Sequence, residues 1–275
     1  MKDAKNVVGA LAGDIIGSKY EFNNHRSTEF PLFAPDCEAT DDSVMTVAVM
    51  KALIDSDGDE GKLYECAVSA MREIGRNYPS CGYGGRFRLW MFSDEPKPYY
   101  SLGNGAAMRV SPVAYVSRSI DEARRKADLV TSPTHNHPEG IKGAEVTAAS
   151  VYMALHGFSK EEILSMAENY YALDFTTDGI RQTYKFDETC AGTIPHALVC
   201  FREAESYEEA VRLAVSIGGD SDTLAAIAGS IAGAYYGVPD DIATKAFAYL
   251  DERLFGICTK FVDYVRMCDE SSKNN

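Results

Sequence analysis

Signals for the start of a helix recur along the chain and constrain its fold more than any other feature of the sequence. Three times a serine is followed three positions later by a glutamate at the head of an amphipathic stretch: Ser119 with Glu122, Ser159 with Glu162, and Ser206 with Glu209. In such a capping box the serine hydroxyl and the glutamate carboxylate each accept a bond from the other residue's backbone N–H. Apolar residues then recur at helical spacing. Each pair therefore predicts a helix.

The same periodicity predicts further helices, whereas alternating runs typical of strands are scarce. We expect helices at about residues 6–18, 42–55, 61–76, 140–156, 191–203, 222–236, 240–253 and 255–267. Residues 6–18 and 222–236 are rich in glycine and alanine, whose small side chains let helix backbones approach closely. These two should form the inner layer of a compact, all-α, multi-helix bundle.

No repeat, linker or composition break divides the chain, so we expect a single domain over residues 1–275. Residues 77–112 are rich in glycine, proline and tyrosine and should form one long irregular segment, which in a compact domain is usually functional. The polar tail from about residue 269 to 275 should fray.

Composition narrows the classes of function. The formal net charge of −14 argues against a nucleic-acid-binding surface. Seven scattered cysteines without a C-x-x-C pair are typical of a reduced, cytoplasmic protein. Asp14 interrupts the apolar stretch near the start, which argues against a secretory signal, and no apolar run reaches the roughly 20 residues that a bilayer needs. We expect a cytoplasmic monomer that does not bind membranes.

Two aspartates beside a long apolar run raise the main question about function. In "IGGDSDTLAAIAGSIAGAYYG", residues 217–237, Asp220, Asp222 and Thr223 stand at the start of a predicted helix. An aspartate there caps the helix and complements the positive end of its dipole, but one is enough. Two carboxylates and a hydroxyl also supply the hard oxygen ligands that magnesium or manganese prefers. From this stretch alone, capping and metal binding both stay open.

A second acidic cluster repeats the arrangement. "ATDDSVMTVAVMKAL" places Thr40, Asp41 and Asp42 at the start of another predicted helix. If the two helices start side by side, four carboxylates and two threonine oxygens converge. Carboxylates that close resist ionisation unless a cation offsets their charge. The pair of clusters therefore predicts a site for two divalent ions.

Residues 9–22, "GALAGDIIGSKYEF", add two more acids. Asp14 lies inside an apolar helix, where a buried acid bonded to neighbouring groups is the simplest interpretation. Glu21 lies just past the end of that helix. It is either a solvated surface group or, in a metal site, a group that orients or deprotonates a water.

Two loops contain candidate groups for an anionic ligand. In "LGNGAAMRVSP" the turn Gly103-Asn104-Gly105 can present backbone N–H groups to a phosphate, although it lacks the lysine of a P-loop. "TSPTHNHPEGIKGAEV" contains His135 and His137, a spacing that zinc sites use, but no third nitrogen or sulfur ligand stands at a suitable spacing. His135 is equally a candidate donor to an anion or a structural loop residue.

Taken together, these motifs resemble those of the ADP-ribosylglycohydrolase family. The resemblance runs nearly end to end, through "GALAGDIIGSKYE", "TDDSVMT", "GNGAAMRVSP", "THNHPEGIKGA" and "GGDSDTLAAIAGSIAGAYYG". It implies an all-α bundle with two divalent ions, magnesium or sometimes manganese, at the base of a cleft that holds ADP-ribose.

The resemblance also implies roles for individual residues. Those that match the family's metal ligands are Thr40, Asp41, Asp42, Asp220, Asp222 and Thr223. Glu21 matches a carboxylate implicated in catalysis or gating, and Asp222 is expected to contribute to catalysis as a ligand. The turn Gly103-Asn104-Gly105 and His135 match segments that hold the ribose and diphosphate, and Tyr99 or Tyr100 could stack on the adenine.

The implied reaction is hydrolysis of the bond between ADP-ribose and an acceptor, which is an ADP-ribosylated protein or a small-molecule conjugate. Bond cleavage at the anomeric carbon develops oxocarbenium-like charge, and divalent ions can orient the ribose and lower the pKa of a water. Two alternatives remain: a non-catalytic ADP-ribose-binding module, and a metal-dependent phosphohydrolase that cuts the diphosphate. The acceptor cannot be read from these motifs.

Overall fold

The regular structure is helical throughout the part of the chain that the computed structural model describes, residues 4–273. That part holds fourteen α-helices and two short 3-10 helices and forms no strand; the one isolated bridge it contains joins Gly103 and Thr189. The 3-10 helices are η1 (Ala4–Val7) and η2 (Asn104–Ala106). The α-helices are α1 (Val8–Ser18), α2 (Asp41–Ser56), α3 (Glu60–Asn77), α4 (Gly85–Phe92), α5 (Ser111–Tyr115), α6 (Ile120–Thr131), α7 (Pro138–Leu155), α8 (Lys160–Glu168), α9 (Thr177–Ile180), α10 (Cys190–Glu203), α11 (Tyr207–Ser216), α12 (Ser221–Tyr236), α13 (Asp240–Phe247) and α14 (Glu252–Lys273). The all-α prediction is confirmed.

Helices α6, α8 and α11 begin directly after Ser119, Ser159 and Ser206, as predicted. Only the start of α8 forms the full reciprocal capping box. At the other two starts the serine hydroxyl accepts the expected bond, but the glutamate carboxylate accepts from the residue before the serine: Glu122 from Arg118 N and Glu209 from Glu205 N. The three helix starts were therefore predicted correctly, but two of the three predicted reciprocal bonds do not form.

Three predicted segments differ in extent from the observed helices, and the short helices α5 and α9 were not predicted. The segment 77–112 is not wholly irregular, because α4 forms within it and buries Phe87, Trp90 and Met91 at helical spacing. The predicted helix 240–253 ends at Phe247, since Asp251 starts a new helix by accepting a bond from Leu254 N at 2.9 Å. That helix, α14, continues as far as Lys273, so the predicted frayed tail is helical over most of its length; residues 274–275 lie outside the described part.

Helices α1 and α12 form the inner layer, as their small residues predicted. Every residue of α1 from Val8 to Gly17 is buried, and α12 is buried from Ser221 to Ala234. Their backbones touch: a Cβ on Gly13 would lie 2.0 Å from the carbonyl oxygen of Ala225, and one on Gly17 would lie 2.5 Å from Cα of Asp222. This close approach brings α1 against the first turn of α12, where the acidic cluster begins.

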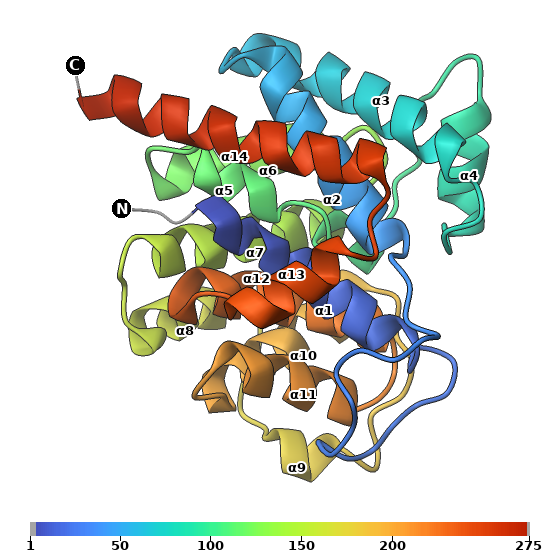
Figure 1. The fold of residues 1–275 in the computed structure, drawn as a ribbon, viewed down its shortest axis with the longest axis vertical. Coiled ribbons are helices and arrows are strands. Elements are labelled where there is room, and N and C mark those ends of the chain that lie inside the picture. Colours follow the sequence, from blue (N-terminus) through green and yellow to red (C-terminus); the bar gives the residue numbers. More distant parts are fainter. Residues whose placement is uncertain (1–3, 274–275) are drawn as a thin grey trace.

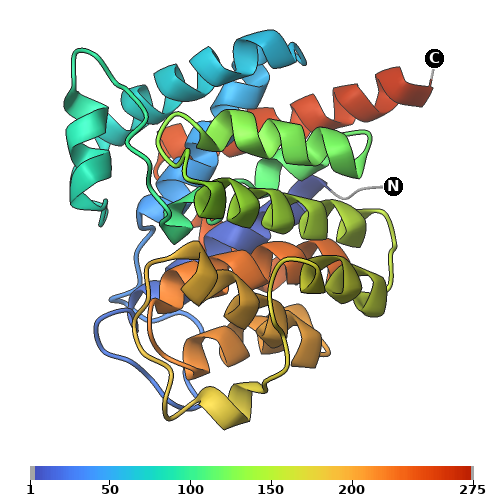
Figure 2. The same cartoon turned by 180° about the vertical axis from the view of Figure 1, so that it is seen from behind.

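The remaining helices surround this pair. Figure 1 shows α14 crossing α2 on one side of the molecule, with α3 and α4 at one end and α9, α10 and α11 at the other. The reverse view shows α6 and α7 between these two ends (Figure 2). Among the described helices, none combines the length and the apolar character needed to cross a bilayer.

Candidate functional site

The buried carboxylate of Asp14 links α1 to the start of α2. It accepts bonds from Thr40 N and Ser43 N, each at 3.0 Å, and from Thr40 Oγ1 at 2.6 Å. Burial raises the pKa of Asp14 to about 6, although the hydrogen bonds from Ser43 and Thr40 oppose that shift. The interpretation of Asp14 as a buried acid bonded to its neighbours is confirmed, and its effect is to hold α2 against α1.

Thr40 lies behind this contact and does not line the cavity described below. Its hydroxyl donates to Asp14 and accepts from Asp42 N at 3.2 Å, which makes it the N-cap of α2. The hydroxyl hydrogen and one lone pair of Thr40 are thus already used within the protein.

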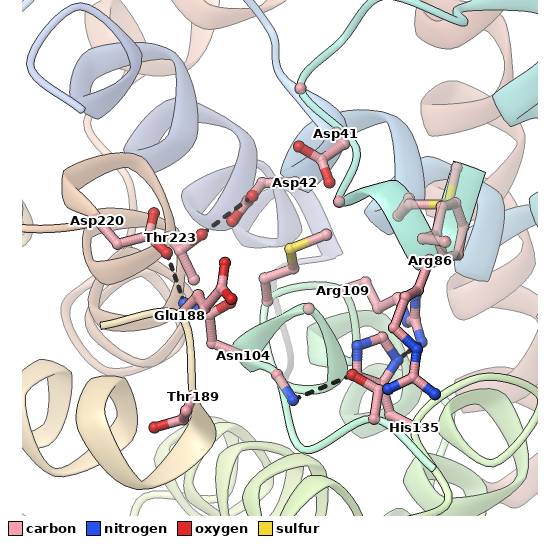
Figure 3. Close-up of a pocket in the computed structure, with 18 of the residues that line it drawn as sticks. Asp41, Asp42, Arg86, Asn104, Arg109, His135, Glu188, Thr189, Asp220 and Thr223 are labelled. Atoms are coloured by element: carbon pink, nitrogen blue, oxygen red, sulfur yellow. Dashed lines mark hydrogen bonds between the residues drawn. The ribbon is translucent and has the colours of Figure 1, made fainter. Parts of the chain in front are cut away.

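Helices α2 and α12 start side by side, as the metal interpretation required. Thr223 Oγ1 donates to Asp42 Oδ2 at 3.2 Å, while Asp42 Oδ1 is buried and has no hydrogen-bond partner. Figure 3 shows Asp42, Thr223 and Asp220 on the same wall of the site. A buried carboxylate oxygen without a donor is costly unless a cation or a proton offsets its charge.

Carboxylate oxygens gather here in two groups that could each hold a metal ion. One group consists of Asp14, Asp42 and Asp222, and the other of Glu21, Asp220 and Asp222; within each group the ligand atoms lie within 4.8 Å of one another. Asp222 belongs to both groups. Asp41 belongs to neither, and its carboxylate lies on the cavity wall next to Gly82.

Helix capping does not explain the two aspartates of α12. Asp220 occupies the N-cap position but makes no side-chain capping bond, and its Oδ2 accepts from Asn104 Nδ2 at 2.7 Å instead. Asp222 Oδ1 accepts from the adjacent Thr223 N, an N–H group of the first turn, at 3.0 Å. One bond to an N–H of the first turn does not account for two buried carboxylates, so capping alone does not explain this stretch, and the cluster has the oxygen chemistry of a divalent-cation site.

The electrostatics of the cluster agree with this conclusion. Burial, followed by the charges of neighbouring carboxylates, raises the pKa of Asp41 to about 8 and that of Glu21 to about 7. The same two causes raise the pKa values of Asp42 and Asp222 well above the usual range. So many acids in one buried place retain protons near neutral pH unless cations neutralise them.

Glu21 lies on a loop that is fastened to the turn before α12. Asn24 Nδ2 donates to Gly219 O at 3.0 Å, and Gly219 N donates back to Asn24 Oδ1 at 2.8 Å. Arg26 adds bonds to the carbonyl oxygens of Ile217, Arg181 and Tyr184. Glu21 is therefore part of the acidic site and not a solvated surface group.

A cavity of about 390 Å³ opens beside the acidic cluster. Its lining includes Glu21, Asp41, Asp42, Asp220, Asp222 and Thr223, and also the other predicted site residues Tyr100, Gly103, Asn104, Gly105 and His135. All the predicted site residues except Thr40 thus meet at one cavity, whose size is typical of a small-molecule site.

The glycine turn is tied into the protein more tightly than its sequence suggested. The N–H of Gly103 donates to Ser101 Oγ at 3.2 Å, and that of Asn104 donates to the carbonyl oxygen of Glu188 at 2.7 Å. Both N–H groups donate to acceptors within the protein, so neither is available to a phosphate, contrary to our expectation. The Asn104 side chain bridges Thr193 and Asp220.

His135 is buried, neutral and oriented by Arg109. Its Nδ1 lies 3.0 Å from Arg109 Nη2 and 2.7 Å from Thr134 Oγ1. Because arginine only donates, Nδ1 accepts and the hydrogen is on Nε2, next to the turn Gly103–Gly105. Burial and the charge of Arg109 lower the pKa of His135 well below its usual value. His135 can therefore donate one hydrogen bond into the cavity.

His137 has a separate, structural role. It caps α7 by accepting a bond from Glu139 N at 3.0 Å, and the ring of Tyr100 packs against it at 4.6 Å. Neither His135 nor His137 belongs to a potential metal-ligand group in the described part of the chain. The geometry does not support the zinc alternative.

Sequence reasoning missed several residues that line the cavity: Arg86, Arg109, Phe186, Glu188 and Thr189. Arg109 stood in a motif that we used, and a lone arginine in an apolar run is a signal for a buried charge. The loop before α10, which contains Phe186 and Glu188, carries no local pattern. Figure 3 shows Arg86, Arg109 and His135 at one end of the cavity and the acids at the other.

Comparisons with known proteins agree with this arrangement. The family model of the ADP-ribosylglycohydrolases matches residues 5–267. Mouse ADP-ribosylhydrolase ARH3 is 26% identical over 84% of this chain and 83% of its own length. ADP-ribosylarginine hydrolase Tri1 of Pseudomonas putida (strain GB-1) is 29% identical over 54% of this chain and 42% of its own.

A solved structure described as an ADP-ribosylglycohydrolase-related protein complex has the same fold. It superposes with a TM-score of 0.66 at 24% identity, covering 97% of this chain and 98% of that one. A family match over nearly the whole chain, together with paired acidic helix starts at one cavity, leads to a plain conclusion: this chain belongs to the ADP-ribosylglycohydrolase family.

Proposed function

We propose that this protein is a hydrolase that uses two divalent ions, Mg²⁺ or Mn²⁺, to cleave the glycosidic bond between ADP-ribose and an acceptor. The acceptor is a side chain of an ADP-ribosylated protein or a small molecule conjugated to ADP-ribose. Family membership and the two relatives named as ADP-ribosyl hydrolases support this activity.

One observation carries the proposal: a buried carboxylate cluster containing the unpartnered Asp42 Oδ1 faces one end of a cavity whose other end holds Arg109 and His135. The donor set fits hard divalent cations, because it consists of oxygen atoms alone. The residues proposed to hold the ions are Asp42, Asp220, Asp222 and Thr223, and the neighbouring Thr40 and Asp41 are further candidates, although Asp41 lies outside both carboxylate groups. Such ions would supply Lewis acidity toward water and the ribose hydroxyls.

The basic end of the cavity suits the diphosphate. Arg86 and Arg109 carry positive charge, and His135 Nε2–H is a fixed donor beside the glycine turn. Arg86 lies 4.9 Å from the ring of Tyr99, and both tyrosines of the pair Tyr99–Tyr100 line the cavity, where either ring can stack on adenine. With the diphosphate bound at this basic end, the ribose that is joined to the acceptor extends toward the carboxylate cluster.

Glu21 is the candidate general base. It is close to Asp220 and Asp222, and burial together with the neighbouring carboxylates raises its pKa to about 7 when no ion is bound. Its carboxylate would orient the attacking water and accept a proton from it as the bond at the anomeric carbon breaks. Asp222 belongs to both carboxylate groups, so it would contribute to catalysis as a metal ligand.

The test is a panel of conjugates in which ADP-ribose is joined to arginine, serine or an O-acetyl group, incubated with the protein and Mg²⁺. Release of free ADP-ribose from any of them is the expected result. Release of AMP instead would identify a phosphohydrolase that cuts the diphosphate. Calorimetric binding of ADP-ribose without turnover of any conjugate would identify a non-catalytic binding module.

A further inference from the structure

The side chain of Asn104 joins the glycine turn to the acidic cluster. Its Nδ2 donates to Thr193 Oγ1 at 3.0 Å and to Asp220 Oδ2 at 2.7 Å. Figure 3 marks the bond between Asn104 and Asp220 with a dashed line. All three side chains are buried. Both hydrogens of this one amide group are thus used to connect α10 with the residue before α12.

The direction of this amide follows from its neighbours. Thr193 Oγ1 donates its own hydrogen to the carbonyl oxygen of Asp187 at 3.0 Å, so toward Asn104 it can only accept. An ionised carboxylate such as that of Asp220 also accepts only. An oxygen in the place of Asn104 Nδ2 would face two acceptors, so the NH₂ group of the amide points at Asp220.

The backbone of the turn holds Asn104 in place. Asn104 N donates to the carbonyl oxygen of Glu188 at 2.7 Å, and its carbonyl oxygen accepts from Ala107 N at 2.8 Å. Two residues earlier, the carbonyl oxygen of Leu102 accepts from Cys190 N at 3.0 Å. The amide of Asn104 is therefore presented to Asp220 from a rigid support.

Asp220, in contrast, is not oriented by its own helix. It follows two glycines with positive φ, 71° at Gly218 and 76° at Gly219, and it occupies the N-cap position of α12 without a side-chain capping bond. Its bond from Asn104 comes from a segment 116 positions away in the chain. A hydrogen bond to a ligating carboxylate fixes the direction in which that carboxylate meets a metal ion.

We propose that Asn104 is a positioning residue for one of the two ions, because it orients Asp220 within the carboxylate group of Glu21, Asp220 and Asp222. The other carboxylate group does not contain Asp220. Loss of the Asn104 amide therefore weakens one ion position and leaves the other intact. This inference rests on the proposed function, since it assigns a role within the same two-ion site.

Calorimetric titration with Mn²⁺ tests the inference without any substrate. The unaltered protein should bind two Mn²⁺ per chain. Asn104→Leu keeps a similar side-chain volume but cannot donate a hydrogen bond. It should weaken one of the two binding steps by about 10–100-fold, the usual loss when a partner of a metal ligand is removed, and leave the other within about threefold. Asn104→Ala, which also lacks the donor, replaces it if the leucine variant does not fold.

Thr193→Val is the matched control. It removes the other bond of the same amide at an equally buried position, keeps the shape of the side chain and leaves the bond from Asn104 to Asp220. Both of its Mn²⁺ steps should stay within about threefold of the unaltered protein. Asp42→Asn identifies the steps: Asp42 belongs to the other carboxylate group, so this variant should weaken the step that Asn104→Leu keeps.

Turnover gives a second measurement. A weakened ion position refills by mass action, so excess Mn²⁺ should restore kcat of Asn104→Leu to within about threefold of the Thr193→Val control. Its calorimetric Kd for ADP-ribose at that Mn²⁺ concentration should also match the control. An amide that contacts the substrate directly would not be replaced by excess metal.

Three results would overturn the inference. Equal weakening of both Mn²⁺ steps in Asn104→Leu and Thr193→Val would show that the amide only holds the fold. Unchanged Mn²⁺ binding in Asn104→Leu, together with a weaker Kd for ADP-ribose, would show that Asn104 binds the ligand instead. Fewer than two Mn²⁺ bound by the unaltered protein would remove the two-ion proposal together with the inference.

Failure of the hydrolase proposal alone gives a different pattern. In that case the unaltered protein binds two Mn²⁺ and Asn104→Leu loses one step, but no conjugate of ADP-ribose is cleaved. That result would support the positioning role of Asn104 and contradict the hydrolase activity.

Discussion

The hydroxyl of Thr223 donates a 3.2 Å hydrogen bond to Oδ2 of Asp42, a residue 181 positions away in the chain. This bond joins the first turn of α12 to the first turn of α2 and leaves Asp42 Oδ1 buried without a partner. It is the clearest sign that the two acidic helix starts form one site.

The Asp222→Asn substitution distinguishes a metal-ligand role of Asp222 from a helix-capping role. Asparagine caps a helix about as well as aspartate, so the fold should persist. A neutral amide is a poorer ligand for a hard cation, so hydrolysis should fall by about 100-fold or more. The melting temperature should no longer rise on adding Mg²⁺. The control is Asp174→Asn, at an exposed position outside the cavity. An Asp222→Asn protein with the activity and Mg²⁺ response of this control would show that Asp222 is not a ligand.

Glu21→Gln should slow turnover without weakening ground-state binding. Glutamine has nearly the same shape but cannot accept a proton from water, so the loss falls on the transition state. We expect kcat to fall by about 10²–10⁴-fold, the usual range for a general base, with the calorimetric Kd for ADP-ribose within threefold. Unchanged kcat in this variant would remove Glu21 from the mechanism.

The metal-free protein should lose stability as the pH rises. Folding raises the pKa of Asp14 to about 6, Glu21 to about 7 and Asp41 to about 8, so the folded state binds more protons than the unfolded state between about pH 4 and 8. Stability from these groups is fully present below the unfolded pKa values near 4 and is lost as the pH rises through the folded values. Urea midpoints in chelator should decline from pH 5 to 8, and saturating Mg²⁺ should reduce that decline. If the urea midpoint of the metal-free protein instead rises from pH 5 to 8, these carboxyl groups do not have the raised pKa values that their burial and mutual repulsion imply.

Asn24→Ala should loosen the loop that holds Glu21. The change removes both bonds between Asn24 and Gly219 and also the bonds from Asn24 Nδ2 to the carbonyl oxygens of Tyr20 and Glu21, and it should cost about 1–2 kcal/mol in the free energy of unfolding. Because Asn24 acts through Glu21, kcat should fall while the Kd for ADP-ribose is kept. Asn169→Ala is the control, since Asn169 also bonds backbone carbonyls but at the exposed end of α8. Equal kcat in the two variants would show that the loop keeps its place without Asn24.

Gly13→Ala should disrupt the contact between α1 and α12. The added Cβ would lie 2.0 Å from the carbonyl oxygen of Ala225, so the helices must separate, at a cost of about 1–3 kcal/mol or more. Gly256→Ala in α14 meets no atom within 4 Å and should instead stabilise the protein by about 0.5–1 kcal/mol. Chemical denaturation of both variants measures the difference, and a stabilising Gly13→Ala would show that the helices can move apart freely.

The sequence alone determined the local features of this protein. Helix starts after Ser119, Ser159 and Ser206 follow from hydrogen bonds within one turn, and the burial of α1 and α12 follows from the small residues along them. The two acidic clusters could be identified as candidate ligands for the same reason, since their members are neighbours in the chain.

Only the tertiary structure decided which of these residues meet, and in what role. Thr40 turned out to be held behind the site by Asp14, Asp220 turned out to bond Asn104 instead of capping α12, and Glu188 entered the cavity from a loop without a pattern. These outcomes depend on how closely α1 packs on α12 and on hydrogen bonds between distant segments. Sequence periodicity carries information about neighbours within a turn or two of helix, whereas contacts across 181 positions are set by packing of the whole bundle.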